Sequence, residues 1–433
     1  MAIAMILAVQ GCTFVDLNRD QKEIDRAGWV KLRVEGERFA EHPVYAALVR
    51  EPGDSMMAVT VETYGVVPGS QKIELRAPEG NYLVVAFQDI NENKKYNESE
   101  PFAAYGQPEP VELWAGRVIE DLTLSLDVAV MPDLWTPKAL QERGVEVSER
   151  LANFGKLISL DDPRFEREVA RTGMWQPAHF IHGNNAGMYI LEEYDPGKTP
   201  VVFVHGIGGS PRHFTTIIEQ IDHERFQPWV FYYPSAMRLQ ELGDYLQVCL
   251  DRMRAEYGYK NVAIVSHSMG GLVSWAGVRA HLKQNPTPYI DFFVTIHSPL
   301  GGMSSAAAGV DHAPVVMNCW IDLDPRSEFI ATVYEEPLPS SIPYHLFYGV
   351  VEGQEVSLPV PKDTLDAELA KVDPSAFNDE TVSLDSQLQR SAVAQTTSLH
   401  SNYATHMGTL RDPQTIETLN SLLAEYADNR PAE

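Results

Sequence analysis

The stretch VAIVSHSMGGL at residues 262–272 decides the fold of the larger part of this chain. Its first half is an apolar run typical of a buried parallel strand, and its second half is a Ser-x-Ser-x-Gly turn that leads into a helix. Ser266 and Gly270 are small, so the strand and the helix can approach closely around Ser268. The turn is expected to strain the backbone of Ser268 and to present its hydroxyl above the carboxyl edge of a sheet. Ser268 is therefore a candidate nucleophile; the alternative is an incidental serine in a surface turn.

A second motif lies upstream, in VVFVHGIGGS at residues 201–210, where an apolar strand ends in His-Gly and a glycine-rich loop. Ester hydrolysis passes through a tetrahedral oxyanion, which preorganised backbone N–H groups stabilise. We expect the N–H groups of Ile207 and Met269 to form this oxyanion hole. The alternative is a phosphate-binding loop, but the segment lacks the Lys-Ser/Thr of a P-loop and the spacing of a dinucleotide-binding fingerprint.

HGIGGS together with SHSMGG resembles the bacterial lipase and esterase branch of the α/β-hydrolase superfamily. The resemblance covers residues 186–428, and residues 1–185 have no counterpart in it. It implies a mostly parallel sheet with helices on both faces and the activity of a serine carboxylic-ester hydrolase. Ser266 departs from the glycine that is usual at the first position of the turn, although serine is also small.

The resemblance also implies the chain order nucleophile, acid, histidine, so the partners of Ser268 must follow it in the sequence. The acid is assigned to Asp379 in the segment FNDETV, which resembles the family's Asn-Asp-Gly-x-Val segment and has Glu380 where glycine is usual. Glu352, which follows a predicted strand, is the alternative acid.

The base is assigned to His406 in the segment YATHMGTL before the last predicted helix, and His400 is the alternative. His205 and His267 lie inside the two motifs, on the wrong side of the family's chain order. We expect both of them to be structural.

The roles follow from the chemistry of such a triad. Ser268 attacks the acyl carbon, His406 takes the proton of Ser268 and returns it to the leaving alcohol, and Asp379 orients the imidazole and stabilises its charged form. The expected substrate is an ester or a lipid, and no metal or cofactor is expected. One alternative is an acyltransferase that uses the same three residues. Another is a non-catalytic binding protein with a hydrolase fold.

The chain divides into regions with different patterns. Residues 186–428 alternate strands with helices, which predicts an α/β-hydrolase domain. Residues 28–130 contain short alternating strands separated by proline- and glycine-containing turns, which predicts an antiparallel β-sandwich. Residues 131–185 are predicted to link the two domains, and residues 1–27 are predicted to be a signal segment and a tether.

The N-terminus carries the pattern of a lipid anchor. Residues 1–9 are all apolar and resemble the central region of a secretory signal. Residues 9–12, VQGC, resemble a bacterial lipobox, which predicts that Cys12 is lipidated. The protein would then lie in the cell envelope of a bacterium, at the outer membrane or the periplasmic face. Gln10 is unusual in that motif, and no Lys or Arg precedes the apolar run; the alternative is a buried first strand with an ordinary cysteine.

The composition excludes several classes of protein. The 433 residues include 34 Lys+Arg and 60 Asp+Glu, a formal net charge of −26 that argues against a nucleic-acid binder. No run reaches the roughly 18–20 apolar residues of a membrane-spanning helix. Cys12, Cys249 and Cys319 are too far apart to form a zinc ribbon. Cys249 and Cys319 have apolar neighbours and are expected to be buried thiols, with a disulfide between them left open.

Two further segments have ambiguous patterns. Residues 89–100 have the oxygen spacing of a calcium loop, but Lys94 stands where an EF-hand needs glycine, so an ordinary polar loop is expected. The apolar stretch 303–321 follows the strand that ends at the catalytic edge of the predicted sheet. We expect it to line the acyl pocket or to form a lid; the alternative is plain core packing.

Overall fold

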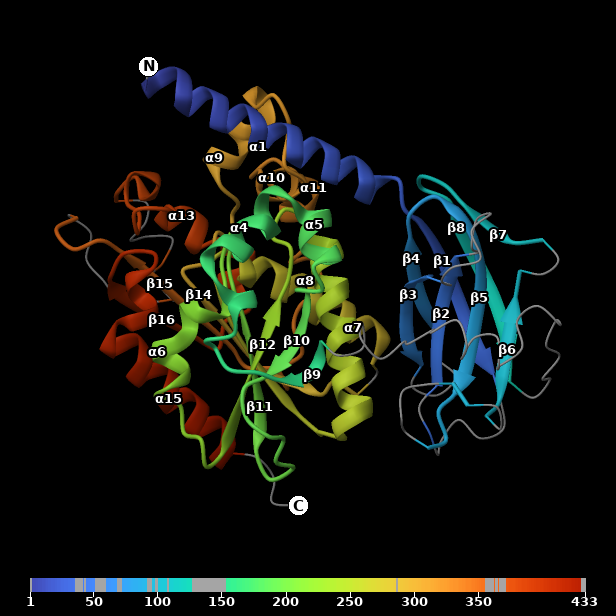
Figure 1. The fold of residues 1–433 in the computed structure, drawn as a ribbon. Helices are drawn as coiled ribbons and strands as arrows, with labels where there is room; N and C mark the ends of the chain where they lie inside the picture. The colour runs from blue at the N-terminus through green and yellow to red at the C-terminus, as the bar shows by residue number, and fades with distance from the viewer. Residues whose placement is uncertain are drawn as a thin grey trace. The chain divides into compact units, whose positions relative to one another are not determined.

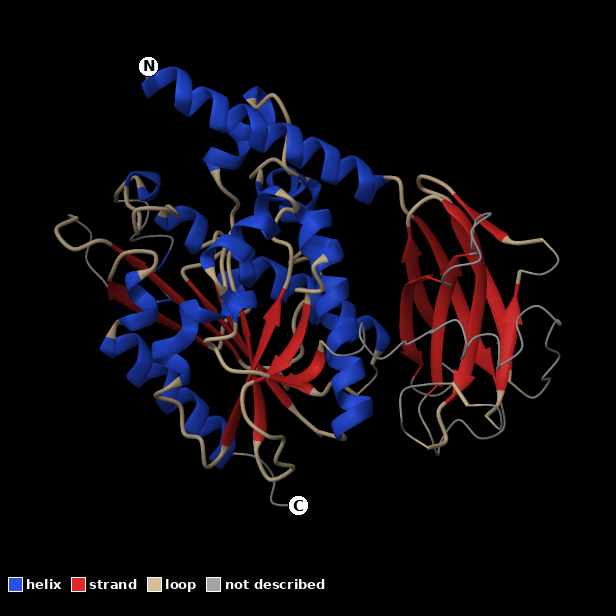
Figure 2. Cartoon of the chain, viewed as in Figure 1, coloured by secondary structure: helices blue, strands red, loops and turns tan. Residues whose placement is uncertain are grey.

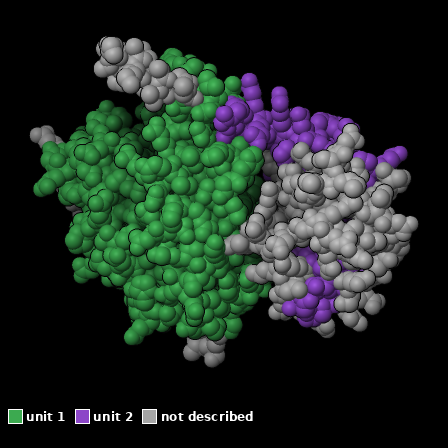
Figure 3. Space-filling view, in the orientation of Figure 1, with its two compact units in different colours: residues 1–18, 153–433 green, residues 19–152 purple. Residues whose placement is uncertain are grey.

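The structure is a computed structural model. It describes residues 2–35, 42, 44–50, 60–67, 72–91, 96–97, 100–106, 109–126, 153–285, 287–354, 362, 365 and 371–429. The chain forms two compact units, one of residues 1–18 with 153–433 and one of residues 19–152 (Figures 1, 2 and 3). The strands of the smaller unit lie within the predicted sandwich, 28–130. Residues 131–152 of the predicted link lie outside the described residues.

The smaller unit contains two sheets. One has the order β4-β1-β8, and the other has the order β3-β2-β5-β6 with β7 paired to β5. Their strands are β1 (Gly28–Glu35), β2 (Val44–Arg50), β3 (Thr60–Val67), β4 (Lys72–Ala77), β5 (Gly80–Gln88), β6 (Phe102–Tyr105), β7 (Val111–Leu113) and β8 (Val118–Ser125). Alternate residues of β1 and of β2, such as Val30 and Leu48, meet in one core, which makes the unit a sandwich.

One pairing in the sandwich differs from the prediction. All neighbours in the larger sheet are antiparallel, as expected, but β1 and β8 run parallel. The chain passes through the other sheet between these two strands, and such a long crossover allows β8 to return in the direction of β1. Strand periodicity alone does not carry this information, because the two directions have the same alternation.

The larger unit is built on an eight-stranded sheet with the order β16-β15-β14-β13-β11-β12-β10-β9. Its strands are β9 (Phe154–Leu157), β10 (Gly187–Ile190), β11 (Thr199–Val204), β12 (Phe226–Tyr232), β13 (Val262–His267), β14 (Ile290–Ile296), β15 (Tyr344–Val350) and β16 (Ser398–Tyr403). Neighbours from β12 to β16 are parallel, and β10 is antiparallel to β12.

Helices cover both faces of this sheet (Figures 1 and 2). On β11, Val202 and Val204 pack with α7 (Leu239–Tyr257) and α8 (Met269–Gln284), whereas Val201 and Phe203 pack with α6 (Thr215–Ile218) and α15 (Pro413–Asp428). A strand buried on both faces is apolar along nearly its whole length, as β11 is after Thr199. This architecture confirms the predicted α/β-hydrolase fold.

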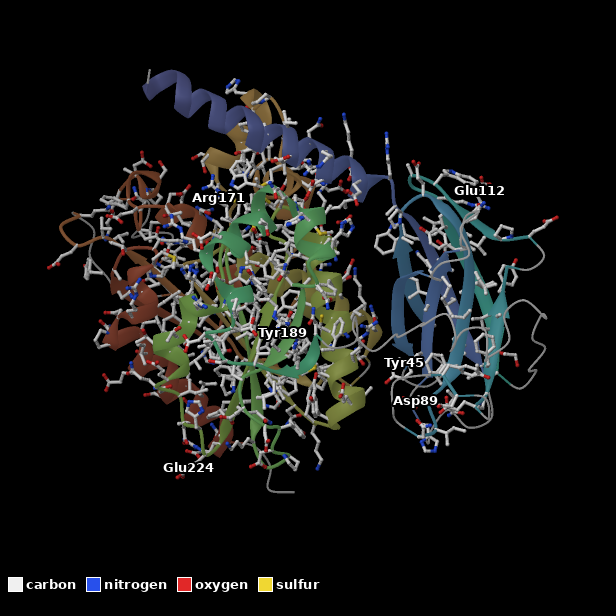
Figure 4. All side chains as sticks on the ribbon, in the orientation of Figure 1. Tyr45, Asp89, Glu112, Arg171, Tyr189 and Glu224 are labelled. Carbon is white, nitrogen blue, oxygen red and sulfur yellow. The ribbon has the colours of Figure 1, made fainter. Side chains whose placement is uncertain are left out.

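Residues of the sheet interior are buried, whereas turns between its elements reach the surface. Tyr189 of β10 is buried in the interior, and Glu224 lies on an exposed turn before β12 (Figure 4). The remaining elements of this unit are η2 (Pro163–Phe165), α4 (Arg167–Trp175), α5 (Pro177–His182), η3 (Pro211–Phe214), α9 (Ser304–His312), α10 (Asn318–Leu323), α11 (Glu328–Thr332), η5 (Pro374–Ala376), α13 (Leu384–Gln387), α14 (Arg390–Ala394) and η6 (Gly408–Arg411).

The apolar stretch 303–321 forms α9 and most of α10. Ala306, Met317 and Cys319 are buried in the core of the larger unit, so the core-packing alternative applies to these residues. Cys319 and Cys249 are both free and buried, so they do not form a disulfide.

Residues 2–25 differ from the predicted tether and from its alternative, a strand. They form one helix, α1 (Ala2–Asp25). The ring of Phe14 packs edge-on against Trp175 of α4 at a centroid distance of 5.7 Å, and Leu17 is fully buried in the core of the larger unit. The sequence analysis missed this helix because charged residues between Asp16 and Arg26 interrupt its apolar pattern. Across the described part of the chain, every helix is too short or too polar to span a membrane.

The described part of loop 89–100 behaves as a polar loop. The carboxylate of Glu100 accepts hydrogen bonds from the backbone N–H groups of Ile90 at 2.9 Å and Asn97 at 2.8 Å. Both oxygens of Glu100 therefore hold the loop closed. Lys94 lies outside the described residues.

Candidate active site

Ser268 stands between β13 and α8 in a strained backbone conformation. Its φ is 57° and its ψ is −135°, a region that non-glycine residues rarely adopt. A Cβ atom on Gly270 would lie within 3.0 Å of the carbonyl oxygen of Val204, so the helix can approach β11 only with glycine there. Ser266 is tolerated at the first position of the turn because its buried hydroxyl donates to the carbonyl oxygen of Val294 at 2.7 Å.

The structure brings Ser268, His406 and Asp379 together. The Nε2 atom of His406 lies 2.8 Å from the Oγ atom of Ser268, and its Nδ1 atom lies 2.8 Å from the Oδ2 atom of Asp379. All three side chains are buried, with Asp379 at 0% exposure. The imidazole can therefore accept the proton of Ser268 while its other nitrogen donates to the carboxylate.

The two alternative residues lie elsewhere. Glu352 is exposed on the turn after β15, whereas the carboxylate of Asp379 accepts a hydrogen bond from His406. His400 lies within β16, where its Nε2 atom is 2.6 Å from the hydroxyl of Ser398.

The loop that carries Asp379 is organised around its carboxylate. The Oδ1 atom accepts from the backbone N–H groups of Thr381 at 3.0 Å and Val382 at 2.7 Å. Glu380, which replaces the glycine of the family motif, adopts a φ of 79°. Burial alone would raise the pKa of Asp379, but the hydrogen bonds from His297 and His406 outweigh it and hold the pKa below its usual range. Asp379 is therefore ionised.

The two motif histidines are structural, as the sequence predicts. The Nδ1–H of His205 donates to the carbonyl oxygen of Gly206 at 2.8 Å, and its ring stacks on Tyr233 at 4.1 Å. Burial lowers the pKa of His205 to about 3, so the ring is neutral. The Nε2–H of His267 donates to the carbonyl oxygen of His406 at 2.8 Å and thereby holds the backbone of His406 in position. Burial also lowers the pKa of His267 well below its usual value.

The glycine-rich loop after β11 lies against the nucleophile. A Cβ atom on Gly206 would lie 2.7 Å from the Cβ atom of Ser268. Met269 is the first residue of α8, so its N–H has no acceptor inside the helix. Among the described residues, none accepts a hydrogen bond from the N–H of Ile207 or of Met269. Both predicted oxyanion donors are therefore available to a ligand.

His297 is a site residue that the sequence analysis missed. It follows β14, is fully buried, and places its Nδ1 atom 2.8 Å from the Oδ2 atom of Asp379. The available signal was a histidine directly after an apolar strand, at the edge where the carboxyl ends of parallel strands meet.

His297, Asp379 and His406 also bring their ligand atoms within 4.8 Å of one another, as in a metal site. A tetrahedral zinc ion with ligands at ~2.1 Å would hold those atoms roughly 3.4 Å apart. The two nitrogen–oxygen distances of 2.8 Å are those of hydrogen bonds. We therefore interpret the cluster as a hydrogen-bonded one.

Comparison with known proteins gives similarity in structure alone. No protein-family model matches the chain, and no curated protein matches it. The Bacillus licheniformis lipase BlEst2 in its mature form is similar with a TM-score of 0.40 and 18% identity, over 55% of this chain and 97% of the lipase. Aspergillus fumigatus lipase B has a TM-score of 0.39 and 18% identity, over 55% of this chain and 56% of that one.

Est1E from Butyrivibrio proteoclasticus has a TM-score of 0.37 and 12% identity, over 56% of this chain and 93% of Est1E. TM-scores of this size carry no argument by themselves. The fold assignment rests on the strand order of the larger sheet and on the turn at Ser268.

Proposed function

We propose that the chain is a serine carboxylic-ester hydrolase whose nucleophile is Ser268, whose base is His406 and whose acid is Asp379. The observation that carries the proposal is the continuous hydrogen-bonded path from Ser268 Oγ through His406 to Asp379, with 2.8 Å at each step. The α/β-hydrolase fold and the two available N–H groups beside Ser268 support it further.

The reaction proceeds in two halves. Ser268 Oγ attacks the carbonyl carbon of the ester while His406 Nε2 takes the hydroxyl proton, and the charge on the carbonyl oxygen is stabilised by the N–H groups of Ile207 and Met269. His406 then gives the proton to the leaving alcohol, and an acyl-enzyme remains. Water, deprotonated by His406, attacks the acyl carbon and releases the acid and Ser268. Asp379 stays ionised throughout and stabilises the imidazolium.

The test is hydrolysis of p-nitrophenyl esters of increasing acyl length by the parent protein and by Ser268→Ala. We expect the variant to lose a factor of about 10⁴–10⁶ in kcat and to resist labelling by a fluorophosphonate, because it lacks the attacking oxygen. The matched control is Ser274→Ala in α8, since this buried hydroxyl has no hydrogen-bond partner among the described residues. Ser268→Ala with a tenth of the parent activity would show that the nucleophile is another residue.

The same assay separates hydrolysis from acyl transfer. When a primary alcohol is added to the reaction, a hydrolase releases mainly free acid, and an acyltransferase releases mainly the new ester. Long-chain preference over the ester series would assign a lipase, and short-chain preference would assign an esterase.

A further inference from the structure

Asp379 serves two histidines with one oxygen atom. Its Oδ2 atom lies 2.8 Å from Nδ1 of His406 and 2.8 Å from Nδ1 of His297. The second ring nitrogen of His297, Nε2, lies 2.9 Å from the Oδ1 atom of Asn402 in β16. His297 itself adopts a φ of 47°, and its N–H donates to Phe347 of β15. Strained backbone of this kind persists where the surroundings fix it, here at the edge of the sheet.

The orientation of the Asn402 amide is set by its other contacts. Asp412 caps α15 and accepts from both the N–H and the hydroxyl of Thr415, each at 2.9 Å. The hydroxyl proton of Thr415 is therefore committed, and its oxygen accepts from Nδ2 of Asn402 at 2.7 Å. A flipped amide would turn its oxygen toward the Asp412 carboxylate, which now lies 3.3 Å from Nδ2. The carbonyl oxygen of Asn402 must consequently face His297.

Both ring nitrogens of His297 therefore face hydrogen-bond acceptors, an ionised carboxylate and an amide oxygen. A neutral imidazole has only one N–H group, so one of the two short contacts would bring lone pairs together. We infer that His297 is a buried imidazolium ion paired with Asp379, and that it is a positioning residue for the triad acid. The role in catalysis rests on the proposed function, whereas the charge state rests on the contacts alone.

The surrounding strands leave room for this pair. A Cβ atom on Gly349 of β15 would lie 2.8 Å from Nε2 of His297 and would also collide with Oδ1 of Asn402. The side chain of Gln387 binds both the N–H and the carbonyl of Gly349 at 2.9 Å, and it donates to Val382 at 3.0 Å. Hydrogen bonds through Gln387 therefore connect β15, beside His297, to the loop that holds Asp379.

The positive charge has a predictable effect on the base. When His406 takes the proton of Ser268, Asp379 faces two imidazolium ions, so its attraction for the proton on His406 is shared with His297. Removal of the His297 charge would strengthen that attraction. On acidification, the variant would therefore lose activity at a higher pH than the parent does. Among the described residues, the charged or titratable groups near the pair include His267 on β13, which interacts with His297, and Asp412 before α15, which contacts Asn402. His267 also interacts with His213 on η3.

The first measurement is independent of activity. The full chain is labelled with ¹⁵N-histidine, and His297→Asn identifies the signals of His297. We expect both ring nitrogens of His297 to carry a proton at pH 7, and we expect Asn402→Leu to remove the Nε2 proton, because that variant deletes its acceptor. A parent protein in which one of these nitrogens lacks a proton would overturn the inference.

The second measurement is the pH profile of ester hydrolysis. We expect His297→Asn to lower kcat by about 10–100-fold with unchanged KM, as the loss of a supporting hydrogen bond does for metal-bound histidines. The acidic limb of kcat/KM should move up by about one pH unit. The matched control is His281→Gln, which replaces a buried histidine at the far end of α8.

The outcomes separate the two proposals. If His297→Asn keeps the parent kcat and pH profile, His297 does not position the acid. If His297→Asn does not fold, Asn402→Leu carries the test with the same expected direction in kcat and pH. If hydrolysis proves independent of Ser268, the proposed function fails, and the ¹⁵N signals still decide the charge state of His297.

Discussion

The side chain of Asp379 accepts hydrogen bonds on both oxygens, two from backbone N–H groups and two from histidines. This carboxylate therefore has two tasks at the scale of a single residue. It orients His406, and it balances a second buried ring at His297. An amide in its place would present an NH₂ group to partners that are themselves donors.

We predict that Asp379→Asn lowers kcat by roughly 10⁴, because the base loses its acceptor and its preferred tautomer. The same change should lower the free energy of unfolding by about 3–5 kcal/mol, since it leaves the other half of a buried ion pair uncompensated. Ester hydrolysis and urea unfolding measure the two effects. Glu352→Gln is the matched control, because Glu352 is exposed; a larger effect of that variant would move the acid to the end of β15.

The grouping of Ser268, Asp379 and His406 could be predicted because each lies in a local motif and the three follow one chain order. The partners of His297 could not be predicted, because nothing near His297 in the sequence marks them. Asn402 lies two strands away in the sheet, and the contact exists only once β14, β15 and β16 are side by side. The contacts of His297 depend on the register between strands, which a single sequence does not display.

At the scale of elements, apolar runs and glycines determined what could be predicted. The strands β11, β13 and β14 each contain an apolar run, and their prediction is confirmed. The strand β16 has the sequence SLHSNY and forms an edge, so it lacks the apolar run that marks a buried strand. The helix α1 was missed because charged residues interrupt the apolar pattern of its second half.

The packing of α8 on β11 gives a prediction at this scale. Gly270→Ala would place a Cβ atom within 3.0 Å of the carbonyl oxygens of Val204 and His205, and backbone atoms cannot move aside as a flexible side chain can. We expect a loss of about 1–3 kcal/mol in the free energy of unfolding and a fall in kcat, because the turn that holds Ser268 must shift.

The matched control is Gly197→Ala on the turn before β11, where the nearest atom is a flexible carboxylate oxygen of Asp195 at 3.2 Å. Urea unfolding and ester hydrolysis of both variants measure the effect. Equal stability of the two variants would mean that the close approach at Gly270 is not required.

At the scale of the whole molecule, buried neutral histidines set the response to acid. Burial lowers the pKa of His205 to about 3 and the pKa values of His281 and His345 to about 4, against 6.5 for an ordinary histidine. Between about pH 6.5 and pH 4, these histidines therefore bind more protons in the unfolded chain than in the folded chain. The stability that these three neutral histidines contribute is fully present above pH 6.5 and is lost as the pH drops toward 4.

We predict that lowering the pH from 7 to 5 costs the parent about 1–2 kcal/mol more than it costs His281→Gln, because the variant removes one such group. Glutamine can still offer an oxygen to the N–H of Tyr289, which now donates to Nε2 of His281 at 3.1 Å. Urea unfolding at the two pH values measures the difference. An equal loss in both proteins would show that His281 is not neutral in the folded chain.

The N-terminal segment concerns the attachment of the whole molecule to a membrane. We propose that Cys12 carries lipid, on the strength of the apolar run before it and the motif VQGC. Phe14 and Leu17 pack on the larger unit, so a helix would join the lipid anchor to that unit in place of a tether. Under the proposed function, such an anchor would hold the enzyme at the surface where its substrates lie.

Acyl chains contribute about 0.8 kcal/mol per buried CH₂ group, and stable anchoring needs more than one chain. We therefore expect the full-length protein, expressed in a bacterium, to fractionate with membranes and its N-terminal peptide to carry acyl mass. Cys12→Ser should be soluble and unmodified, with unchanged kcat on a water-soluble ester because the site lies elsewhere in the fold. If the parent and Cys12→Ser both remain soluble and the peptide has its unmodified mass, then α1 is only a structural helix of the larger unit.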